Sequence, residues 1–256
     1  MFNGFTQEAI TFLTDLRLNN NQTFFENNKA RYEETVKAPM RELCLELAPV
    51  IALIDPKLDT RPGSTMSRIR RDTRFSKDKS PFRDHAWLGW RYPGERRSEG
   101  FHMYWGFGPD WLGWGCGSYC ADRPLMDAFR TLIRTDPDQV RDAIAALHPG
   151  QRYALYGEAF RKITIPPDVP EDLKPLYVMK YLGAESAQAT EKDWEQLFTR
   201  ELVDRITQEI HSMAPLVRLM TGLRTEAYRP GKAETAEVRP VAGGKLTVRS
   251  AEEFEF

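Results

Sequence analysis

The stretch Phe101-His-Met-Tyr-Trp-Gly-Phe107, followed by Gly108-Pro109-Asp110 and then by Trp111-Leu-Gly-Trp-Gly-Cys-Gly-Ser-Tyr119, decides the fold class of this chain. In the first segment apolar residues alternate with polar or small ones, which is the two-residue period of a β-strand. The Gly-Pro-Asp tripeptide is typical of a tight turn. The stretch therefore predicts a β-hairpin.

The register of this hairpin determines what covers the glycines of its second strand, Gly113, Gly115 and Gly117, which we call the glycine stripe. Such a stripe leaves bare backbone, which either a ligand or a large side chain covers. With a three-residue loop, the stripe lies opposite the apolar residues of the first strand, Phe101, Met103 and Trp105. With a two-residue loop at Pro109-Asp110, it lies opposite His102 and Tyr104 and opens a polar slot. We expect the first, purely structural register.

Amphipathic helices flank the hairpin on both sides along the chain. Apolar residues recur every three or four positions after Thr6 and again after Pro39, which suits the first turn of a helix. Helix start signals precede three later segments, at Asp122, Asp136 and Thr190. The last helix is predicted to bend at Pro215 and to end near Gly222.

These elements predict an α+β fold, in which antiparallel strands between about residues 65 and 120 pack against helices from both ends of the chain. We expect one domain over residues 5–222. Residues 223–256 are predicted to form a C-terminal extension that is partly irregular, with at most one short strand over 245–248.

Composition excludes several classes of protein. Of the 256 residues, 41% are hydrophobic and 29% charged, so the chain can bury a sizeable core. The net charge of -1 argues against a bulk nucleic-acid binder or a polybasic membrane anchor. No apolar run approaches the roughly 20 residues that span a bilayer, and no export signal is recognisable. Three cysteines without a C-x-x-C pair fit a reducing compartment, so we expect a soluble, cytoplasmic protein.

A basic segment precedes the hairpin: residues 61–97 contain 11 Lys or Arg and 4 Asp or Glu, a local charge of +7. If residues 68–82 are extended, four charged side chains share one face, Arg68, Arg70, Asp72 and Arg74. A short helix beginning near Lys79 would add backbone N–H groups, and together these donors suit a phosphate or carboxylate. Alternatively, the segment is a solvated strand edge in which Arg71 pairs with Asp72 or Arg74 pairs with Asp78.

Residues 68–82 have the pattern R-x-x-R-D-x-R-F-S-K-D-K-x-P-F, which resembles the defining motif of a bacterial and fungal family known as domain of unknown function 2461. Asn19-Asn20-Asn21, with the aromatic residues that follow, resembles the N-terminal pattern of that family. The glycine stripe followed by Pro124 resembles its middle. Phe24 and Phe82 stand where the family usually has tryptophan and tyrosine. The resemblance covers about residues 5–222 and implies no established activity.

We predict a pocket for a small phosphorylated or carboxylated molecule, lined by the cations Arg68, Arg71, Arg74 and Lys79. If the protein is an enzyme, Asp72 or His102 is the expected acid or base. Asp72 is flanked by arginines, which favour its ionised form, so it is better suited to orient them than to transfer protons. One alternative is a module in which Trp87, Trp90 and nearby arginines bind single-stranded nucleic acid or a protein. The other is an arginine cluster with only a structural role.

The plausible metal or acid–base residues of the basic and aromatic third are scattered along the chain: Asp72, Asp84, His85 and His102. No H-x-x-x-H or paired-cysteine spacing accompanies them. We therefore assign no metal ligand and name no cofactor. A small anion is the favoured partner, ahead of nucleic acid, and no membrane partner is expected.

Overall fold

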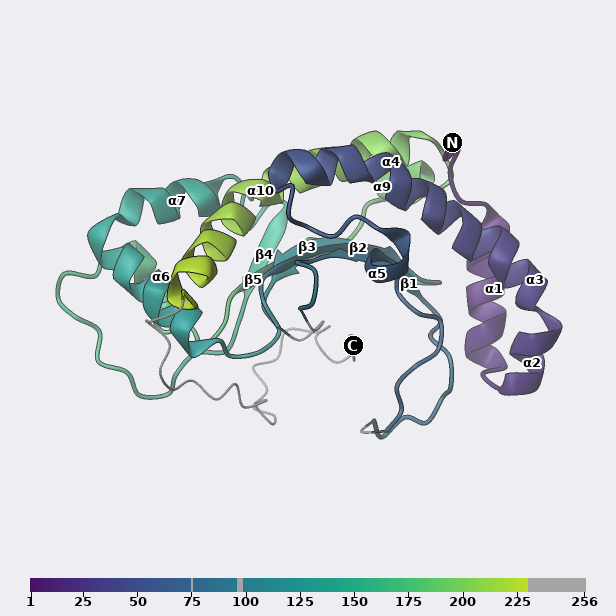
Figure 1. Ribbon diagram of the computed structural model, residues 1–256, viewed down its shortest axis with the longest axis horizontal. Helices are drawn as coiled ribbons and strands as arrows, with labels where there is room; N and C mark the ends of the chain where they lie inside the picture. The colour runs from purple at the N-terminus through teal and green to yellow at the C-terminus, as the bar shows by residue number, and fades with distance from the viewer. Residues whose placement is uncertain (75, 96–98, 230–256) are drawn as a thin grey trace.

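The computed structural model describes residues 1–74, 76–95 and 99–229. Its centre is an antiparallel sheet with the strand order β1-β2-β3-β5-β4 (Figure 1). The strands are β1 (Ala86–Trp90), β2 (His102–Phe107), β3 (Leu112–Gly117), β4 (Tyr153–Tyr156) and β5 (Gly183–Ser186). The predicted hairpin is confirmed as β2 and β3, which occupy the middle of the sheet.

Helices from both ends of the chain cover one face of this sheet, so the predicted α+β class is confirmed. α4 (Ala38–Ile54) contacts β1, and α10 (Glu201–Ala227) contacts β2, β3 and α4 (Figure 1). Beyond β1 stand α1 (Gln7–Leu18), α2 (Gln22–Asn27) and α3 (Lys29–Tyr32). The other helices are α5 (Pro62–Thr65), α6 (Arg123–Thr135), α7 (Pro137–Ala145), α8 (Lys174–Tyr177) and α9 (Glu191–Leu197).

The helix predicted to begin at Pro39 is continuous with the one before it. A π-helical turn, η1 (Glu33–Lys37), joins α3 to α4. Proline lacks an N–H group, and in a regular helix its ring clashes with the carbonyl four residues earlier, so a wider turn before Pro39 accommodates it. The apolar positions expected in α4 are all buried: Met40, Leu43, Leu47, Ile51 and Ile54.

The long helix predicted from Thr190 is two helices. Thr190 forms a capping box with Asp193 and begins α9, as the sequence predicts, but a short break separates α9 from α10. The predicted end at Gly222 is wrong, because α10 continues to Ala227. Beyond Gly222, Arg224 forms hydrogen bonds with the carboxylates of Glu95 and Asp122. These bonds hold the last turns of α10 in place.

The C-terminal extension predicted to begin at residue 223 starts inside α10. The short strand predicted over 245–248 lies outside the described residues, and the single domain over 5–222 stays a prediction. Among the described helices, none is both long and apolar enough to cross a membrane. The three cysteines are free thiols: Cys44, Cys116 and Cys120.

The hairpin has the two-residue turn, so the register that we favoured is wrong. Gly108 N donates to Trp111 O at 2.7 Å, which closes the turn around Pro109-Asp110. The cross-strand pairs on one face are apolar: Met103 with Cys116, Trp105 with Trp114 and Phe107 with Leu112. A shift by one residue would reverse the faces of a strand, and this register puts the apolar side chains of both strands on the same face.

Aromatic side chains cover the glycine stripe, Trp111 at Gly113 and tyrosines at Gly115 and Gly117, in the space where the two-residue register predicts an open polar slot. Tyr104 pairs with Gly115, and a Cβ atom on Gly115 would lie 2.9 Å from the Tyr104 ring and 2.5 Å from Ala184 O. A Cβ atom on Gly117 would lie 2.6 Å from the hydroxyl of Tyr156. The glycines are therefore needed for close packing against aromatic rings, which is a structural role.

Candidate functional site

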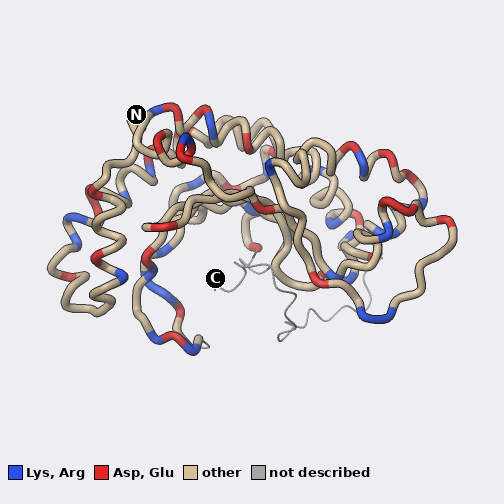
Figure 2. The backbone as a smooth tube through the Cα atoms, turned by 180° about the vertical axis from the view of Figure 1, so that it is seen from behind, with Lys and Arg blue, Asp and Glu red and all other residues tan. Residues whose placement is uncertain are grey.

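The basic segment forms an arm that leads from α5 into β1, and the structure describes its residues 66–74 and 76–82. Its first half, residues 66–71, runs antiparallel to residues 81–88, as bonds such as Arg83 N to Ile69 O (2.8 Å) show. The predicted extended conformation is thus confirmed for this half. Basic residues outnumber acidic ones along the arm, six to two, and both kinds are visible there in Figure 2.

The tip of the arm, residues 72–74 and 76–80 among those described, does not have the predicted conformation. Between α5 and β1 the described residues contain no helix, so the short helix expected near Lys79 is wrong. Instead, Asp78 Oδ1 accepts a hydrogen bond from Ser80 N at 2.8 Å, a local side-chain turn that competes with helix formation. The tip therefore offers no cluster of helical N–H groups to an anion.

The structure does not bring the four predicted anion-binding cations together. Arg74 pairs with Asp72 through Nε–Oδ1 (2.8 Å) and Nη2–Oδ2 (2.5 Å) on the exposed tip. Lys79 Nζ donates to a backbone carbonyl of the tip at 2.8 Å. Arg68 lines a groove on the side of α2 and α3, and Arg71 alone of the four lines the cleft described below.

The two predicted acid–base residues lie in separate places. The hydrogen bond from Arg74 is the main cause that lowers the pKa of Asp72 to about 2, which agrees with an orienting role. His102 lies on β2, is only 7% exposed, and has Nε2 3.4 Å from Glu95 Oε2. It borders a cavity of about 20 Å³, which has room for about one water molecule. Asp72 lines neither this cavity nor the cleft.

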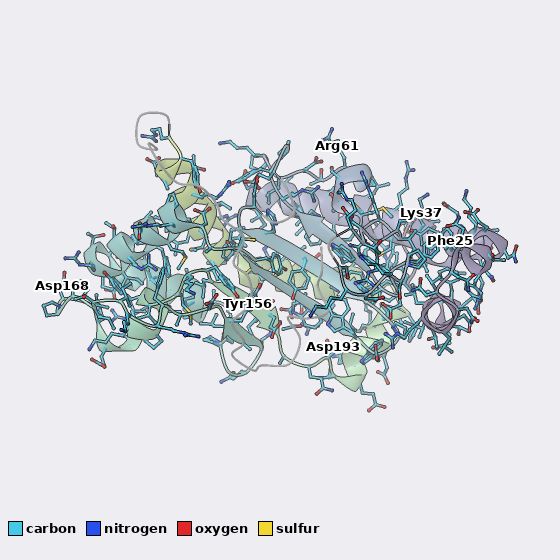
Figure 3. The ribbon with its side chains drawn as sticks, turned by 90° about the horizontal axis from the view of Figure 1, so that it is seen from below. Phe25, Lys37, Arg61, Tyr156, Asp168 and Asp193 are labelled. Carbon is cyan, nitrogen blue, oxygen red and sulfur yellow. The ribbon has the colours of Figure 1, made fainter. Side chains whose placement is uncertain are left out.

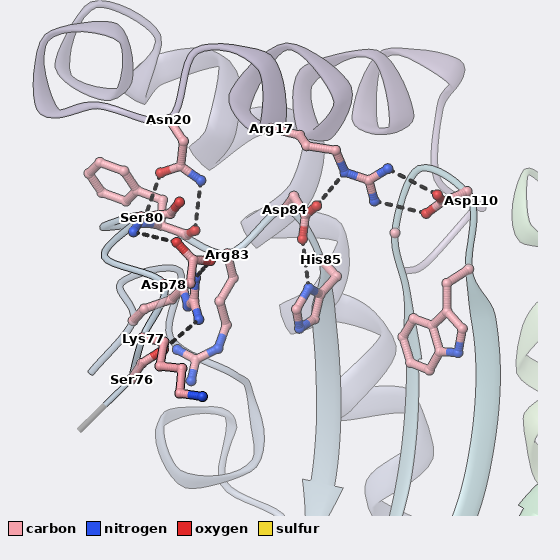
Figure 4. A pocket seen from close by; sticks show the side chains of 14 residues that line it. Arg17, Asn20, Ser76, Lys77, Asp78, Ser80, Arg83, Asp84, His85 and Asp110 are labelled. Carbon is pink, nitrogen blue, oxygen red and sulfur yellow. Dashed lines mark hydrogen bonds and ion pairs between the residues drawn. The ribbon is translucent and has the colours of Figure 1, made fainter. Parts of the chain in front are cut away.

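A cleft of about 510 Å³ lies where the end of α1, the arm, the start of β1 and the β2–β3 turn meet (Figure 4). Its volume falls in the range of about 300–1,000 Å³ that is usual for small-molecule sites. Two groups of ionisable side chains line it. We call them the acid–base half, around Asp84 and His85, and the cation half, around Arg71 and Arg83.

In the acid–base half, Arg17 of α1 binds two carboxylates. It donates to Asp84, and to Asp110 through Nη1–Oδ2 (3.0 Å) and Nη2–Oδ1 (2.8 Å). His85 Nδ1 lies 2.8 Å from Asp84 Oδ1. Burial is the largest influence and raises the pKa of Asp84, but the hydrogen bonds and charges of His85 and Arg17 together lower it below its usual range. An ionised Asp84 favours the proton on Nδ1 of His85, so Nε2 carries the lone pair.

Two tryptophans orient the His85 ring. It stacks on Trp87 at 5.4 Å with 27° between the planes, and it meets the edge of Trp111 at 6.4 Å and 78°. With Asp84 on Nδ1, the imidazole is held on three sides. This is the arrangement of a positioned general acid or base, in which a carboxylate sets the tautomer and packing sets the direction.

In the cation half, Arg83 is buried, with 7% exposure. Its Nη1 donates to the carbonyl oxygens of Arg68 (3.3 Å) and Arg70 (2.8 Å), and its guanidinium lies 4.9 Å from the centre of the Trp87 ring. The pKa of Arg83 is lowered. Burial is the largest cause, and the positive charge of Arg71 is the second. Arg83 is therefore a desolvated cation beside a second cation.

Arg71 and Lys77 complete this half with one carboxylate, Asp78. Arg71 forms an ion pair with Asp78 and donates to Ser76 Oγ at 3.4 Å. The N–H of Ser80 is the main cause that lowers the pKa of Asp78 to about 2. Among the residues that line this half, Arg71, Lys77 and Arg83 are positively charged and Asp78 is negatively charged, and the negative charge of Asp72, outside the lining, also favours the charged form of Arg83.

Sequence reasoning missed most of these residues. Asp84 and His85 belonged to the scattered acid–base set, and their adjacency was the signal that could have singled them out. Arg83 directly follows the recognised motif, but nothing in its spacing shows that it is buried. Arg17 has no local signal, because its partner Asp110 is far away in sequence and only the fold brings them together.

The two alternative interpretations fare differently. Trp87 is 4% exposed and Trp90 is 0% exposed, so neither offers an open face on which a base could stack. The structural alternative expected Arg71 to pair with Asp72 or Arg74 with Asp78, but Arg71 pairs with Asp78 and Arg74 with Asp72, so these arginines do have internal partners, and the partners are exchanged. Within the described ranges, no group of three or more His, Cys, Asp or Glu side chains could hold a metal ion.

A family model described as "Conserved hypothetical protein (DUF2461)" matches residues 8–219, which include α1, the arm, all five strands and most of α10. The search of curated proteins gave no match.

Proposed function

The chain belongs to the DUF2461 family of conserved hypothetical proteins, as the motif in the arm predicts, and from this premise we propose that its cleft binds a small phosphorylated or carboxylated ligand. The anionic group of the ligand contacts Arg71, Lys77 and Arg83. Arg71 is thus retained from the sequence prediction, while Lys77 and Arg83 replace the other three cations.

The observation that carries this proposal is the placement of Arg71 beside the buried Arg83. Two guanidinium groups that share a poorly solvated wall repel each other, and Arg83 has also lost hydration. An anion placed between them would offset both costs, because charge-assisted hydrogen bonds to arginine are short and strong. Lys77, which is exposed, would add a third positive charge at the entrance.

The acid–base half gives the same ligand a group that can exchange protons. His85 lines the same cleft as the cation half, so a ligand whose anionic end lies at that half would have His85 available to its remaining atoms. Nε2 of His85 would accept or donate a proton there, while Asp84 stabilises the charged imidazolium that forms on protonation. Arg17 holds Asp84 in place and is not itself expected to contact the ligand, since its donors bind Asp84 and Asp110.

Thermal denaturation in phosphate and sulfate at constant ionic strength tests the proposal. Ligand binding to the folded state stabilises it by about 2.7 kcal/mol at a hundredfold excess over Kd, so we expect the Tm to rise by several degrees. Arg71→Gln and Lys77→Gln should each reduce this rise. Lys77 is exposed, so its variant should fold even if changes at the more buried Arg71 lower the starting Tm.

Arg123→Gln is the matched control, because Arg123 is 85% exposed on α6 and outside the cleft. It should respond to phosphate as the parent does. A Tm that phosphate, sulfate and small phosphorylated or carboxylated compounds leave unchanged would refute anion binding. An equal rise in the parent, Arg71→Gln and Lys77→Gln would also refute this cleft as the site. Submicromolar binding of single-stranded DNA or RNA with a steep salt dependence would favour the nucleic-acid alternative instead.

A further inference from the structure

A second cavity lies on the other side of the arm from the cleft. It is a groove of about 500 Å³ between the α2–α3–η1 segment and residues 62–70. Apolar side chains form its floor and walls: Phe25, Tyr32, Met66 and Ile69. Phe25 and Tyr32 are 6% and 8% exposed, and they pack with ring centres 5.5 Å apart, so the floor is part of the hydrophobic core.

Positive charge surrounds this apolar groove. Five cations line it (Lys29, Lys37, Arg41, Arg68 and Arg70), against two carboxylates (Glu26 and Glu33). Lys37 pairs with Glu33 at 2.9 Å, and Arg70 lies 3.8 Å from Glu26. The other three cations have no carboxylate of the described residues within 4.0 Å. Figure 3 shows Phe25 and Lys37 at the same end of the molecule.

An aromatic pair separates the groove from the cleft. Phe25 lines the groove and Phe82 lines the cleft, and their rings stack with centres 4.3 Å apart and 20° between the planes. Arg70 lies over the Phe82 ring at 5.2 Å. The arm thus has Arg68 and Arg70 on the groove and Arg71 on the cleft, so the two cavities can be altered independently.

We propose that the groove binds a small amphipathic anion, a linear acyl chain that ends in a carboxylate. The chain would lie on the partly exposed Met66 and Ile69, above the floor of Phe25 and Tyr32, where removal of apolar surface from water is favourable. The carboxylate would lie at the rim, where Lys29, Arg41 and Arg68 offer positive charge that no carboxylate of the described residues pairs with. The volume of the groove matches that of small-molecule sites.

Isothermal titration with decanoate, below its micelle concentration, tests this inference. Each CH₂ group that becomes buried should tighten binding by up to about fourfold, so hexanoate should bind much more weakly than decanoate. Decylamine, with the same chain and the opposite charge, should not bind. Arg68→Glu should weaken decanoate binding by more than about fivefold, because an exposed ion pair contributes up to this amount and the variant also adds a repulsive charge.

Arg123→Glu is the matched control, since it makes the same charge reversal on α6, away from both cavities. Decanoate should bind this variant and Arg71→Gln as tightly as the parent, and phosphate should not displace it. Absence of decanoate binding would overturn the inference. The inference would also be overturned if decylamine bound as tightly as decanoate, or if Arg71→Gln abolished decanoate binding. It would be overturned as well if the only ligand that bound saturably were an acidic amphipathic peptide. Because Arg68→Glu leaves the cleft intact, failure here is distinguishable from failure of the proposed anion site.

Discussion

Asn20 and Phe82 form two reciprocal hydrogen bonds: Asn20 Nδ2 donates to Phe82 O at 2.9 Å, and Phe82 N donates to Asn20 Oδ1 at 3.0 Å. The side-chain amide therefore satisfies both backbone groups of Phe82, as a neighbouring strand would. Asn20 follows α1 and Phe82 belongs to the arm, so these bonds fix the arm to the N-terminal helices. Both residues line the cleft, and both belong to the segments by which the sequence resembles its family.

Replacement of Asn20 should therefore loosen the arm. Asn20→Ala leaves the N–H and C=O of Phe82 unpaired in a partly buried position, which should cost about 1–3 kcal/mol in the free energy of unfolding. Asn20→Asp keeps the acceptor and loses the donor, so it should also destabilise. Asn19→Ala is the control, because Asn19 Nδ2 donates only within the α1 end, to Asp15 O. Urea denaturation of the three variants measures the difference, and equal stability of Asn20→Ala and Asn19→Ala would contradict it.

The glycine stripe should tolerate no side chain. Gly115→Ala places a Cβ atom 2.5 Å from Ala184 O, and overpacking of this kind costs about 1–3 kcal/mol. Gly222→Ala offers a matched contrast, since nothing lies within 4 Å of its Cβ position in α10. Alanine should stabilise that helix by about 0.5–1 kcal/mol. Thermal denaturation should thus show shifts of opposite sign, and a neutral Gly115→Ala would disprove the close packing.

Because of Asp84, the stability of the folded protein should decrease at acidic pH. Its pKa is lowered in the folded protein, so the unfolded chain binds its proton more readily. The stabilisation that comes from ionised Asp84 is complete above the pKa of an unfolded aspartate, about 3.9. It disappears as the pH falls through the lower pKa that Asp84 has in the folded protein. Asp84→Asn should reduce the Tm near pH 6 and flatten the decrease in Tm below pH 4. Tm curves for parent and variant that stay parallel from pH 6 to pH 2 would contradict this assignment.

Glu209 should be the most costly charge to remove. It is 1% exposed on α10, accepts a hydrogen bond from Tyr153 Oη at 2.5 Å, and forms ion pairs with Arg152 and Arg205. Glu209→Gln leaves these cations short of a counter-charge, so we expect a loss of about 3 kcal/mol. Arg205 retains Asp193 at 2.8 Å, which limits the effect.

Glu226→Gln is the control for this change, because Glu226 pairs with Arg229 on the exposed end of α10. Exposed pairs contribute about 0–1 kcal/mol, so its effect on urea denaturation should be small. A loss in Glu209→Gln no larger than that in Glu226→Gln would show that the buried network is not important for stability.

Local features were predictable from the sequence because their causes lie within a few residues. The capping residues Asp122, Asp136 and Thr190 accept hydrogen bonds from backbone N–H groups three positions later. The Gly-Pro-Asp turn and the alternation of β2 predicted the hairpin, and helices on both sides of it predicted the α+β class. The motif in the arm identified the family.

Tertiary packing decided the features that the sequence left open. The hairpin register follows from which face of β2 and β3 is covered by helices, and a single-residue shift exchanges the two faces. Gly222 does not end α10, because Arg224 finds partners elsewhere in the fold. Neither cause is visible in a short window of sequence.

The concentration of positive charge in the arm before β1 can be read from the sequence alone, but which of these charges act together cannot. In an extended arm neighbouring side chains point to different sides, so Arg68 and Arg71 line separate cavities although they are three positions apart. It is the folding of distant segments onto one another that places Arg71 with Arg83 and Lys77, and that lets Arg17 of α1 hold Asp84 beside His85. The physical reason is that charges group by distance in space and by shared burial, and both depend on contacts between segments far apart in the chain.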